Sequence, residues 1–471
     1  DHGNLVMDSN DLERERGITI TAKNTAVDWT PPGGSTPYRI NIVDTPGHAD
    51  FGGEVERILS MVDSVLLLVD AMDGPMPQTR FVTEKAFARG LHPIVVINKV
   101  DRPGARPDWV LNQTFDLFDK LGATDEQLDF PVVYTSALNG YAGFTPDVRE
   151  GDMTPLFETI IKHVAPPKVD PEGPFQMQVS SIAYSSYVGA IAIGRITRGK
   201  VKPNQPVTVI DHDGKTRNGK VLQVLGFMGL ERTEVPEAMA GDIIAITGIE
   251  GPRISDTLCD PNNVEALPPL SVDEPTVTMT FEVNNSPFAG QDGKYVTSRQ
   301  IRERLERELI HNVALRVEDT GSPDKFRVSG RGELHLGILL ENMRREGYEL
   351  GVSRPQVITK QVNGETHEPY EQLTVDIETQ HQGAVMEQLG QRKGDLLNME
   401  PDGKGRVRLE YMIPARGLIG FQTDFLTATA GSGLIYHVFD HYGPEKKGMV
   451  GGRVNGVLIS NGAGMSVAYA L

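Results

Sequence analysis

The chain has 471 residues, enough for three or more domains that each bury a hydrophobic core. A formal net charge of −18 excludes a protein that coats nucleic acid through a generally basic surface, so any RNA contact must be local. The single cysteine, Cys259, excludes a disulfide framework within the chain and is typical of a reducing compartment. No apolar stretch approaches the roughly 20 residues of a membrane span.

Four apolar runs in the first third of the chain predict buried strands that end in polar or small residues. They lie at residues 38–43, 64–69, 93–97 and 132–138, with a helical pattern at residues 78–88. Near-continuous apolar strands separated by helices are typical of a mostly parallel sheet with helices on both faces. In such a sheet, ligands bind at the carboxyl ends of the strands.

The first run leads into Asp44-Thr45-Pro46-Gly47-His48. A carboxylate at a strand end, followed by a glycine whose amide can approach a phosphate, suits a site for Mg²⁺ and a terminal phosphate. We expect Asp44 to hold the metal through a water molecule and Gly47 to contact the γ-phosphate. An ordinary Pro-Gly turn is the alternative.

The third run leads into Asn98-Lys99-Val100-Asp101, 54 residues after Asp44. A carboxylate accepts two hydrogen bonds at once, and among the common bases only guanine offers a ring NH beside an exocyclic amino group. Adenine would leave that carboxylate unpaired, and a site built around a buried acceptor rejects such a ligand by about 10⁴-fold. The motif therefore predicts guanine binding, although an ordinary turn after a strand can carry the same letters.

The fourth run ends in Ser136-Ala137-Leu138. Backbone amides near Ser136 and Ala137 are expected to bind the guanine oxygen. This interpretation depends on the order of the motifs, because the three residues have no distinctive pattern by themselves.

The stretch from Glu13 to Ile20, ERERGITI, followed by DTPGHADF, resembles the translational GTPases, the ribosome-dependent relatives of elongation factor G. The resemblance implies that Thr19 binds Mg²⁺ together with Asp44 when GTP is present. It also implies that His48 positions the attacking water, with Ile18 as half of an apolar gate beside it and Gly47 nearby. A polar loop residue is the alternative for His48.

The same resemblance implies a phosphate loop, whose amides and lysine hold the nucleotide phosphates. The chain begins Asp1-His2-Gly3, which is how the loop of this family approaches its lysine, and then continues at Asn4 without one. We expect Asp1, His2 and Gly3 to contact GTP, and the lysine to belong to a segment omitted between Gly3 and Asn4.

Proline-rich linkers divide the chain. The expected domains are a GTPase domain at residues 1–168, a small antiparallel β-barrel at 173–267 with a hairpin tip at 213–214, and two ferredoxin-like α+β sandwiches at 272–358 and 366–447. The barrel and the string GRGELHL resemble domains of elongation factor G. In that string, Arg331 is expected to belong to a turn that enters a helix at residues 333–346, with contact to a partner as the alternative for Arg331.

Elongation factor G has a further long domain between its two sandwiches, whereas only about ten residues intervene here. This feature narrows the resemblance to the shorter BipA (TypA) and LepA families. The strings KVDRPGARPDWV, ARGLIGF and NGVLISNG resemble BipA, and the resemblance covers essentially the whole chain. Residues 448–471 are expected to begin the C-terminal domain of that family.

The resemblance implies slow GTP hydrolysis to GDP and phosphate, stimulated by the large ribosomal subunit, with Mg²⁺ as cofactor. It also implies a cytoplasmic monomer in bacteria that contacts rRNA and the GTPase-associated region, with both subunits and tRNA as further candidates and no membrane partner. Roles in ribosome assembly and stress are carried by the resemblance alone. The alternatives are a LepA-like elongation factor, a nucleotide-insensitive ribosome-docking scaffold and an adenine-nucleotide enzyme, which Asp101 disfavours.

Basic residues at 392–393 and 404–408 lie near loops of the last sandwich. Paired with phosphates, they would anchor RNA in a salt-dependent way. A solvated charged face is the alternative, and the sequence leaves both open.

Overall fold

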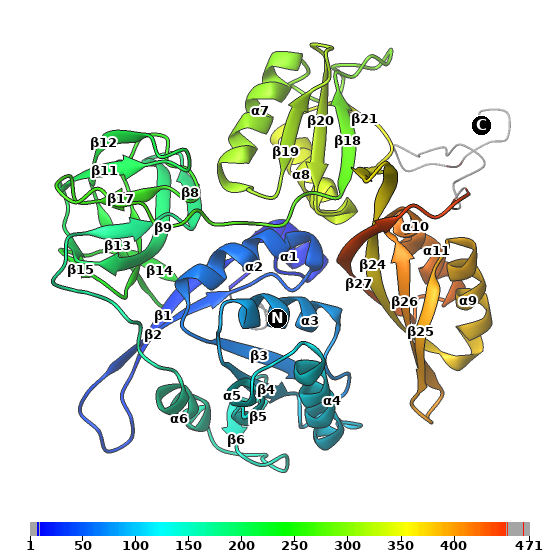
Figure 1. The fold of residues 1–471 in the computed structure, drawn as a ribbon, viewed down its shortest axis with the longest axis horizontal. Helices are drawn as coiled ribbons and strands as arrows, with labels where there is room; N and C mark the ends of the chain where they lie inside the picture. Colours follow the sequence, from blue (N-terminus) through cyan, green and yellow to red (C-terminus); the bar gives the residue numbers. More distant parts are fainter. Residues whose placement is uncertain (1–6, 9, 449, 451–464, 466–471) are drawn as a thin grey trace. The chain divides into compact units, whose positions relative to one another are not determined.

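The computed structural model describes residues 7–8, 10–448, 450 and 465. The chain divides into two compact units, Asp1–Ile358 and Thr359–Leu471 (Figure 1). The predicted phosphate-loop residues Asp1, His2 and Gly3, and nearly all of the predicted C-terminal domain from residue 448, lie outside the described residues.

A four-stranded sheet near the start of the first unit carries the guanine motif. Its order is β3-β4-β5-β6, with parallel pairs between the first three strands and an antiparallel pair at β6. Apolar residues of α3 and α4 cover one face, and those of α6 cover the other. The predicted mostly parallel sheet with helices on both faces is therefore confirmed. The bounds are β3 Val65–Asp70, α3 Pro77–Ala88, β4 Pro93–Asn98, α4 Pro107–Lys120, α5 Asp125–Leu128, β5 Val132–Ser136, β6 Tyr141–Gly143 and α6 Thr154–His163.

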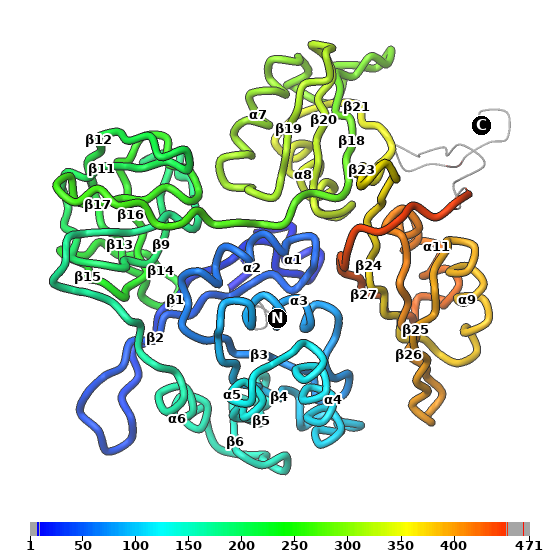
Figure 2. The backbone as a smooth tube through the Cα atoms, in the orientation of Figure 1, coloured from blue at the N-terminus to red at the C-terminus, as the bar shows by residue number. Residues whose placement is uncertain are grey.

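The strand at residues 38–43 does not join this sheet, contrary to our expectation. As β2 (Tyr38–Asp44), it pairs antiparallel with β1 (Lys23–Trp29) along its whole length. Arg39 and Asn41 alternate with apolar residues, and such a strand suits a two-stranded hairpin with one wet face better than a sheet buried on both sides. The hairpin loop projects from the unit (Figure 2).

Short helices flank this hairpin. Helix α1 (Asp11–Arg16) precedes β1, and η1 (Ala49–Phe51), α2 (Gly52–Ile58) and η2 (Leu59–Met61) follow β2. Apolar residues of β1 and of residues 58–61 share a hydrophobic core with the next sheet along the chain. This shared core joins the hairpin to the second sheet.

The second sheet has nine strands and wraps around one hydrophobic core. Its hydrogen-bonded path within the described residues runs from β12 to β14, so the predicted barrel is an open one. The predicted hairpin tip at Asp213-Gly214 is confirmed between β11 and β12, where Gly214 has a φ of 80°. The bounds of its strands are β7 Gln176–Gln178, β8 Ser181–Ser185, β9 Gly189–Arg198, β11 Pro206–Ile210, β12 Thr216–Lys220, β13 Val224–Met228, β14 Glu231–Glu234, β16 Ile243–Ile246 and β17 Thr257–Cys259. Two further short strands, β10 Lys200–Val201 and β15 Ala238–Met239, pair with each other in a separate two-stranded sheet.

The last part of the first unit is a ferredoxin-like sandwich. Its antiparallel sheet has the order β19-β20-β18-β21, and α7 and α8 pack on it through residues such as Leu305 and Leu336. The predicted helix at residues 333–346 is α8. The bounds are β18 Val277–Glu282, α7 Ser298–His311, β19 Arg316–Asp319, β20 Lys325–Gly330, α8 Glu333–Glu346, β21 Gly351–Val352 and β22 Gln356–Val357.

The second unit repeats this topology. The long strand β24 pairs with β26 on one side and with β27 on the other, and β25 forms the edge beyond β26. A core that includes Leu373 and Phe425 lies between the sheet and its helices. Both predicted sandwiches are thus confirmed. The bounds are β23 Lys360–Val362, β24 Glu365–Glu378, η3 Thr379–His381, α9 Gln382–Gln391, β25 Asp395–Pro401, β26 Arg406–Pro414, α10 Ala415–Leu418, α11 Phe421–Ala428 and β27 Leu434–Pro444.

Candidate functional site

The ends of β4 and β5 bring the two predicted guanine-binding segments together. Asn98 Oδ1 accepts a hydrogen bond from the backbone N–H of Ala137 at 2.9 Å and another from Thr135 Oγ1 at 3.1 Å. The N–H of Val100, whose side chain is buried, donates to the carbonyl of Thr135 at 3.3 Å. Because neighbouring parallel strands end at the same edge of the sheet, these contacts fix Asn98 beside the amides near Ser136 and Ala137.

The carboxylate that is expected to select guanine, Asp101, is also held in place. Asn139 donates to Asp101 Oδ2 at 3.0 Å and to Ser136 Oγ at 2.9 Å. A carboxylate oxygen has two lone pairs, so this contact leaves Asp101 able to accept two hydrogen bonds from guanine. Leu138, which is 76% exposed, lies between Ser136 and Asn139 in the chain.

Lys99 is oriented by a residue that the sequence analysis did not identify. Its backbone has a φ of 67°, and its Nζ lies 2.8 Å from Asp70 Oδ2, at the end of the neighbouring strand β3. Burial acts to raise the pKa of Asp70, but the hydrogen bond from Lys99 and the N–H groups of Met72 and Asp73 hold it below its ordinary value. Asp70 is therefore ionised at neutral pH and keeps the lysine beside the base site.

The predicted magnesium ligands, Thr19 and Asp44, lie in the segment around α1 and the β1–β2 hairpin. Thr19, in the segment after α1, donates from Oγ1 to Asp8 Oδ1 at 3.1 Å, and Asp44 ends β2. Burial, followed by the negative charge of Asp8, raises the pKa of Asp44. Asp8 is 5% exposed and was missed by the sequence analysis, because no motif marks it.

These oxygen donors fit a magnesium ion shared with nucleotide phosphates. Mg²⁺ is usually held by one or two protein oxygens together with phosphate oxygens and water. A half-buried carboxylate whose ionisation is disfavoured by a nearby carboxylate is stabilised by a divalent cation. Among the described residues no group of three or more His, Cys, Asp or Glu side chains is arranged to hold a metal, so an all-protein metal cage is not found in them.

His48 begins the short helix η1 after Gly47. Its Nδ1 accepts a hydrogen bond from the backbone N–H of Asp50 at 3.2 Å, which places the proton of the neutral ring on Nε2. The side chain is 29% exposed, and its ring centroid lies 6.1 Å from that of Phe51. Gly47 is exposed, and a Cβ built there would meet no atom within 4 Å. The space beside Gly47 is thus open to a phosphate.

The predicted gate residue Ile18 is half-buried. It packs against an apolar cluster that contains Phe51, the ring next to His48, and residues of α1 and α8. The predicted gate residue thus shares an apolar cluster with the aromatic ring that neighbours His48.

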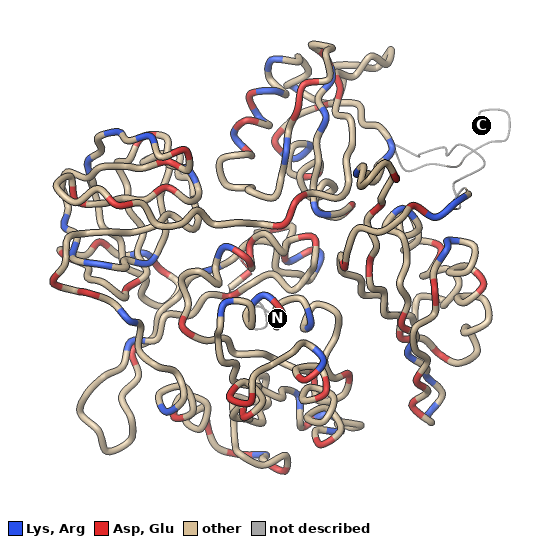
Figure 3. Tube along the Cα trace, viewed as in Figure 1, with Lys and Arg blue, Asp and Glu red and all other residues tan. Residues whose placement is uncertain are grey.

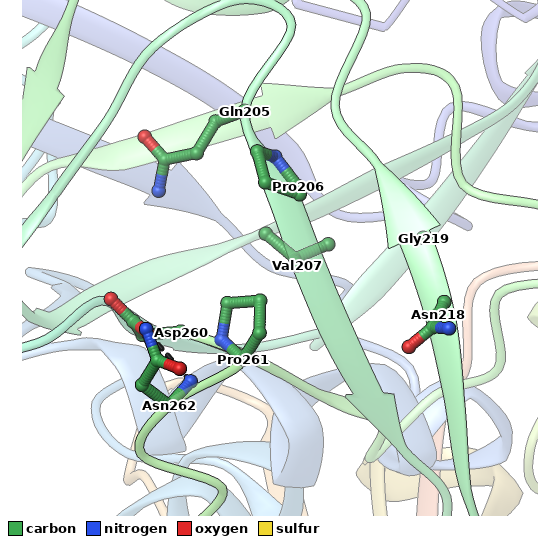
Figure 4. A pocket seen from close by; sticks show the side chains of 8 residues that line it. All are labelled: Gln205, Pro206, Val207, Asn218, Gly219, Asp260, Pro261 and Asn262. Atoms are coloured by element: carbon green, nitrogen blue, oxygen red, sulfur yellow. Dashed lines mark hydrogen bonds between the residues drawn. The ribbon is translucent and has the colours of Figure 1, made fainter.

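A cavity of about 680 Å³ lies elsewhere, on the second sheet (Figure 4). It is open and lined by residues of β11, β12 and the loop after β17, which are Gln205, Pro206, Val207, Asn218, Gly219, Asp260, Pro261 and Asn262. Its one carboxylate, Asp260, already accepts from the N–H of Asn262. None of the sequence motifs reaches this cavity, and we assign it no chemistry.

Two of the basic residues singled out in the second unit, Arg392 and Arg406, make contacts within the unit itself. Arg392 is buried and donates to the carbonyls of Gly417 and Ile419 and to Asp424, while Arg406 pairs with Asp376. Arg392 is thus excluded as an RNA anchor. Basic and acidic residues are also interspersed elsewhere, as along α7 (Figure 3). Within the described part of the chain, no helix combines the length and apolarity needed to cross a bilayer.

Three segments of the chain match known protein families. Residues 1–166 match the family described as Elongation factor Tu GTP binding domain. Residues 189–259 match Elongation factor Tu domain 2, and residues 365–449 match Elongation factor G C-terminus. These matches agree with the first sheet, the second sheet and the second unit.

A solved structure from Thermus thermophilus has the same fold. It aligns with a TM-score of 0.60 and 17% identity, covering 94% of this chain and 92% of the other. At this identity the likeness concerns the fold alone.

Similar curated proteins span almost the whole chain. The protein named Large ribosomal subunit assembly factor BipA from Haemophilus influenzae is 69% identical over 466 residues, covering 99% of this chain and 75% of that protein. The proteins of the same name from Escherichia coli K12 and Buchnera aphidicola are 68% and 58% identical, each with 76% of its length covered. Given this identity and coverage, the chain belongs to the BipA family of translational GTPases.

Proposed function

We propose that the chain hydrolyses GTP to GDP and phosphate when the large ribosomal subunit stimulates it. Membership in a family of translational GTPases supports GTP binding and hydrolysis as such. The observation that carries the proposal is the guanine corner, in which Asn98 accepts from the amide of Ala137, and Asp101 accepts from Asn139, which also donates to Ser136. A corner whose side chains are held in this way lowers the ordering cost of binding guanine.

The reaction is in-line attack of water on the γ-phosphate, driven by positioning and by charge stabilisation. Asp101 and Asn98 fix the base, Gly47 lies against the γ-phosphate, and Nε2 of His48 contacts the attacking water. Thr19 and Asp44 would hold Mg²⁺, which supplies positive charge to the phosphate oxygens. The phosphate-loop residues Asp1, His2 and Gly3 and the lysine expected after them complete the site.

The proposed partner is the ribosome, and therefore the proposed location is the cytoplasm. The name of the relatives, large ribosomal subunit assembly factor, supports the large subunit as the particle that is bound. Contacts to its rRNA and GTPase-associated region, with both subunits and tRNA as further candidates, belong to this proposal, as does a monomeric state.

The proposed domain limits are 1–168, 173–267, 272–358 and 366–447, with a C-terminal domain from residue 448. They are supported by two segments without a described helix or strand, one between α6 and β7 and one between β17 and β18. The division into two units after Ile358 supports the third limit.

Substituting His48→Ala tests the function. We expect binding of GDP and GTP to be retained and the turnover stimulated by large subunits to fall about 10²-fold or more, the scale of losing a general acid–base or positioning group. Asp101→Asn is the matched control, since it should shift preference toward xanthine nucleotides while leaving His48 in place. Unchanged turnover in His48→Ala contradicts the assignment, and a parent protein that binds neither GDP nor ADP would instead favour a nucleotide-insensitive scaffold.

A further inference from the structure

We propose that Asp50 is a positioning residue for GTP hydrolysis because it caps helix α8 and thereby ties the segment that carries His48 to the ferredoxin-like part of the first unit. This inference rests on the proposed function. It assigns a role to an acidic residue that the nucleotide motifs do not explain, and to the string GRGELHL, in which α8 begins.

Helix α8 has no cap of its own. Its N-cap residue is Gly332, which lacks a side chain, and the first turn would leave N–H groups without a local acceptor. Asp50 Oδ2 accepts from the backbone N–H of His335, the third residue of the helix, at 3.0 Å. A carboxylate at this end is also favoured by the helix dipole. Asp50 is 4% exposed, so it has little access to water in place of this contact.

Gly332 is required by the closeness of Asp50. A Cβ built on Gly332 would overlap the carboxylate carbon and both carboxylate oxygens of Asp50. The φ of Gly332 is 175°, an extended value that any residue adopts, so the backbone itself does not demand glycine. The glycine therefore makes room for the cap that comes from 282 positions earlier in the chain, the difference between 332 and 50.

The capping residue is linked directly to His48. The N–H of Asp50 donates to His48 Nδ1 at 3.2 Å, and Asp50 Oδ1 lies 3.7 Å from the same nitrogen. The ring of Phe51 lies 6.1 Å from the ring of His48 and 6.1 Å from that of His335. Displacement of α8 therefore acts on the peptide groups that orient the imidazole.

A buried ion network around Arg331 also holds the start of α8. Arg331 Nη1 lies 3.3 Å from Glu56 Oε1 of α2, and Nη2 lies 3.7 Å from Asp273 Oδ2. Lys85 of α3 approaches both of these carboxylates. Breaking one partner of a buried pair is costly, so this network keeps the Arg331-Gly332 turn against η1 and α2.

His335 completes the turn. Its Nδ1 accepts from the N–H of Arg331 at 3.0 Å, and its Nε2 lies 3.0 Å from Asn312 Oδ1. The pKa of His335 is lowered by burial, which keeps the ring neutral and suits this pattern of one donor and one acceptor. These contacts fix the start of α8. A shift of the helix would therefore move Asp50 through the hydrogen bond from the N–H of His335.

The first experiment breaks the contact from the side that lies outside the nucleotide site. In Gly332→Ala we expect the kcat of GTP hydrolysis stimulated by large ribosomal subunits to fall about 10- to 100-fold, the scale of misplacing a catalytic group by about 1 Å. The affinity for GDP and the KM for GTP should stay within about twofold of the values for the parent protein. Gly337→Ala is the matched control, because a Cβ at Gly337 on the same helix meets no atom within 4 Å.

A second pair of variants separates positioning from folding. Asp50→Ala should lower the same kcat and also the melting temperature, while Asp50→Asn, which retains an acceptor oxygen, should recover part of both. Adding Gly332→Ser to Asp50→Ala provides α8 with a local cap. We expect this double variant to recover the melting temperature and not the kcat.

The outcomes are distinct from those of the proposed function. If Gly332→Ala and Asp50→Ala hydrolyse GTP on ribosomes at the parent rate while His48→Ala does not, the positioning role is overturned and the GTPase assignment stands. Recovery of kcat in the double variant Asp50→Ala, Gly332→Ser would also overturn the positioning role, because the stability of α8 alone would then explain the loss of kcat in Asp50→Ala. A parent protein that binds no GTP would overturn the proposed function instead.

Discussion

Asp44, which is proposed to hold a metal, weakens the fold when no metal is bound. Burial and the charge of Asp8 raise its pKa, so its folded-state pKa lies above the unfolded value of about 3.9. A raised pKa means that the group contributes stability at low pH and loses it as the pH rises through the folded pKa. At neutral pH without nucleotide, the ionised carboxylate therefore destabilises the protein.

We accordingly expect Asp44→Asn to stabilise the nucleotide-free protein at pH 7 by about 1 kcal/mol, a common gain when a functional residue is relieved of strain. Its Mg²⁺-dependent affinity for GTP should fall at the same time. Thermal melts at pH 7 and at pH 3 check this, because the difference between parent and variant should vanish at the lower pH. A variant that is less stable at pH 7 would refute it.

Gly47 allows a sharper test of the phosphate contact. Because a Cβ there meets no atom within 4 Å, Gly47→Ala should leave the melting temperature unchanged. The added methyl group would occupy the space proposed for the γ-phosphate, so we expect GTP affinity to fall about 10-fold while GDP affinity stays the same. Fluorescence titration of both nucleotides measures the ratio, and an equal loss for the two would place the γ-phosphate elsewhere.

The residues that sequence reasoning missed share one property. Asp50, Asp70 and Asn139 are polar residues to which the motifs assign no role, and each contacts a residue that they do assign. Asn139 was the most accessible to prediction, since it lies three residues after Ser136 in the same turn. The partner of Asp50 is 285 residues away, and no local pattern indicates such a distance.

At the scale of elements, a buried anion anchors the segment before β1. Glu13, with a fully buried side chain, accepts from the N–H groups of Ile20 and Thr21 and pairs with Lys23 at 2.8 Å. Burial acts to raise the pKa of Glu13, but these hydrogen bonds and the charge of Lys23 hold it below its ordinary value. Helix α1 thereby holds the loop that carries Thr19.

Glu13→Gln should cost about 1–3 kcal/mol at pH 7, the usual penalty for weakening hydrogen bonds to a buried charged group. Since the folded pKa is depressed, this stability is present above the unfolded pKa of about 4.3 and is lost as the pH falls through the folded value. Chemical denaturation at pH 7 and at low pH checks the prediction. A constant difference across this range would mean that shape, and not charge, anchors the loop.

The prediction of helices and strands succeeded where the periodicity of apolar residues agreed with the residues that begin and end an element. The helix expected at residues 333–346 is α8 residue for residue, because glycines flank an amphipathic run. It failed for residues 38–43, where an alternating strand was assigned to the parallel sheet. Alternation indicates one wet face, and that property is better satisfied by the β1–β2 hairpin.

At the scale of the whole molecule, the two units have separate hydrophobic cores. Leu373, fully buried in the second unit, and Phe281, fully buried in the first, are matched probes of these cores. Replacing either by alanine should cost about 2–5 kcal/mol. We expect calorimetry to show two transitions, with Leu373→Ala lowering one and Phe281→Ala lowering the other. A single transition lowered by both variants would show that the units unfold together.

The sequence by itself determined the fold class, the guanine specificity and the family, because these depend on short motifs and on the periodicity of adjacent residues. Only the tertiary structure decided which distant groups meet: Asp70 with Lys99, Asp8 with Thr19, and Asp50 with the start of α8. The physical reason is that such pairs form when whole elements pack, and the spacing of residues along the chain does not encode that packing.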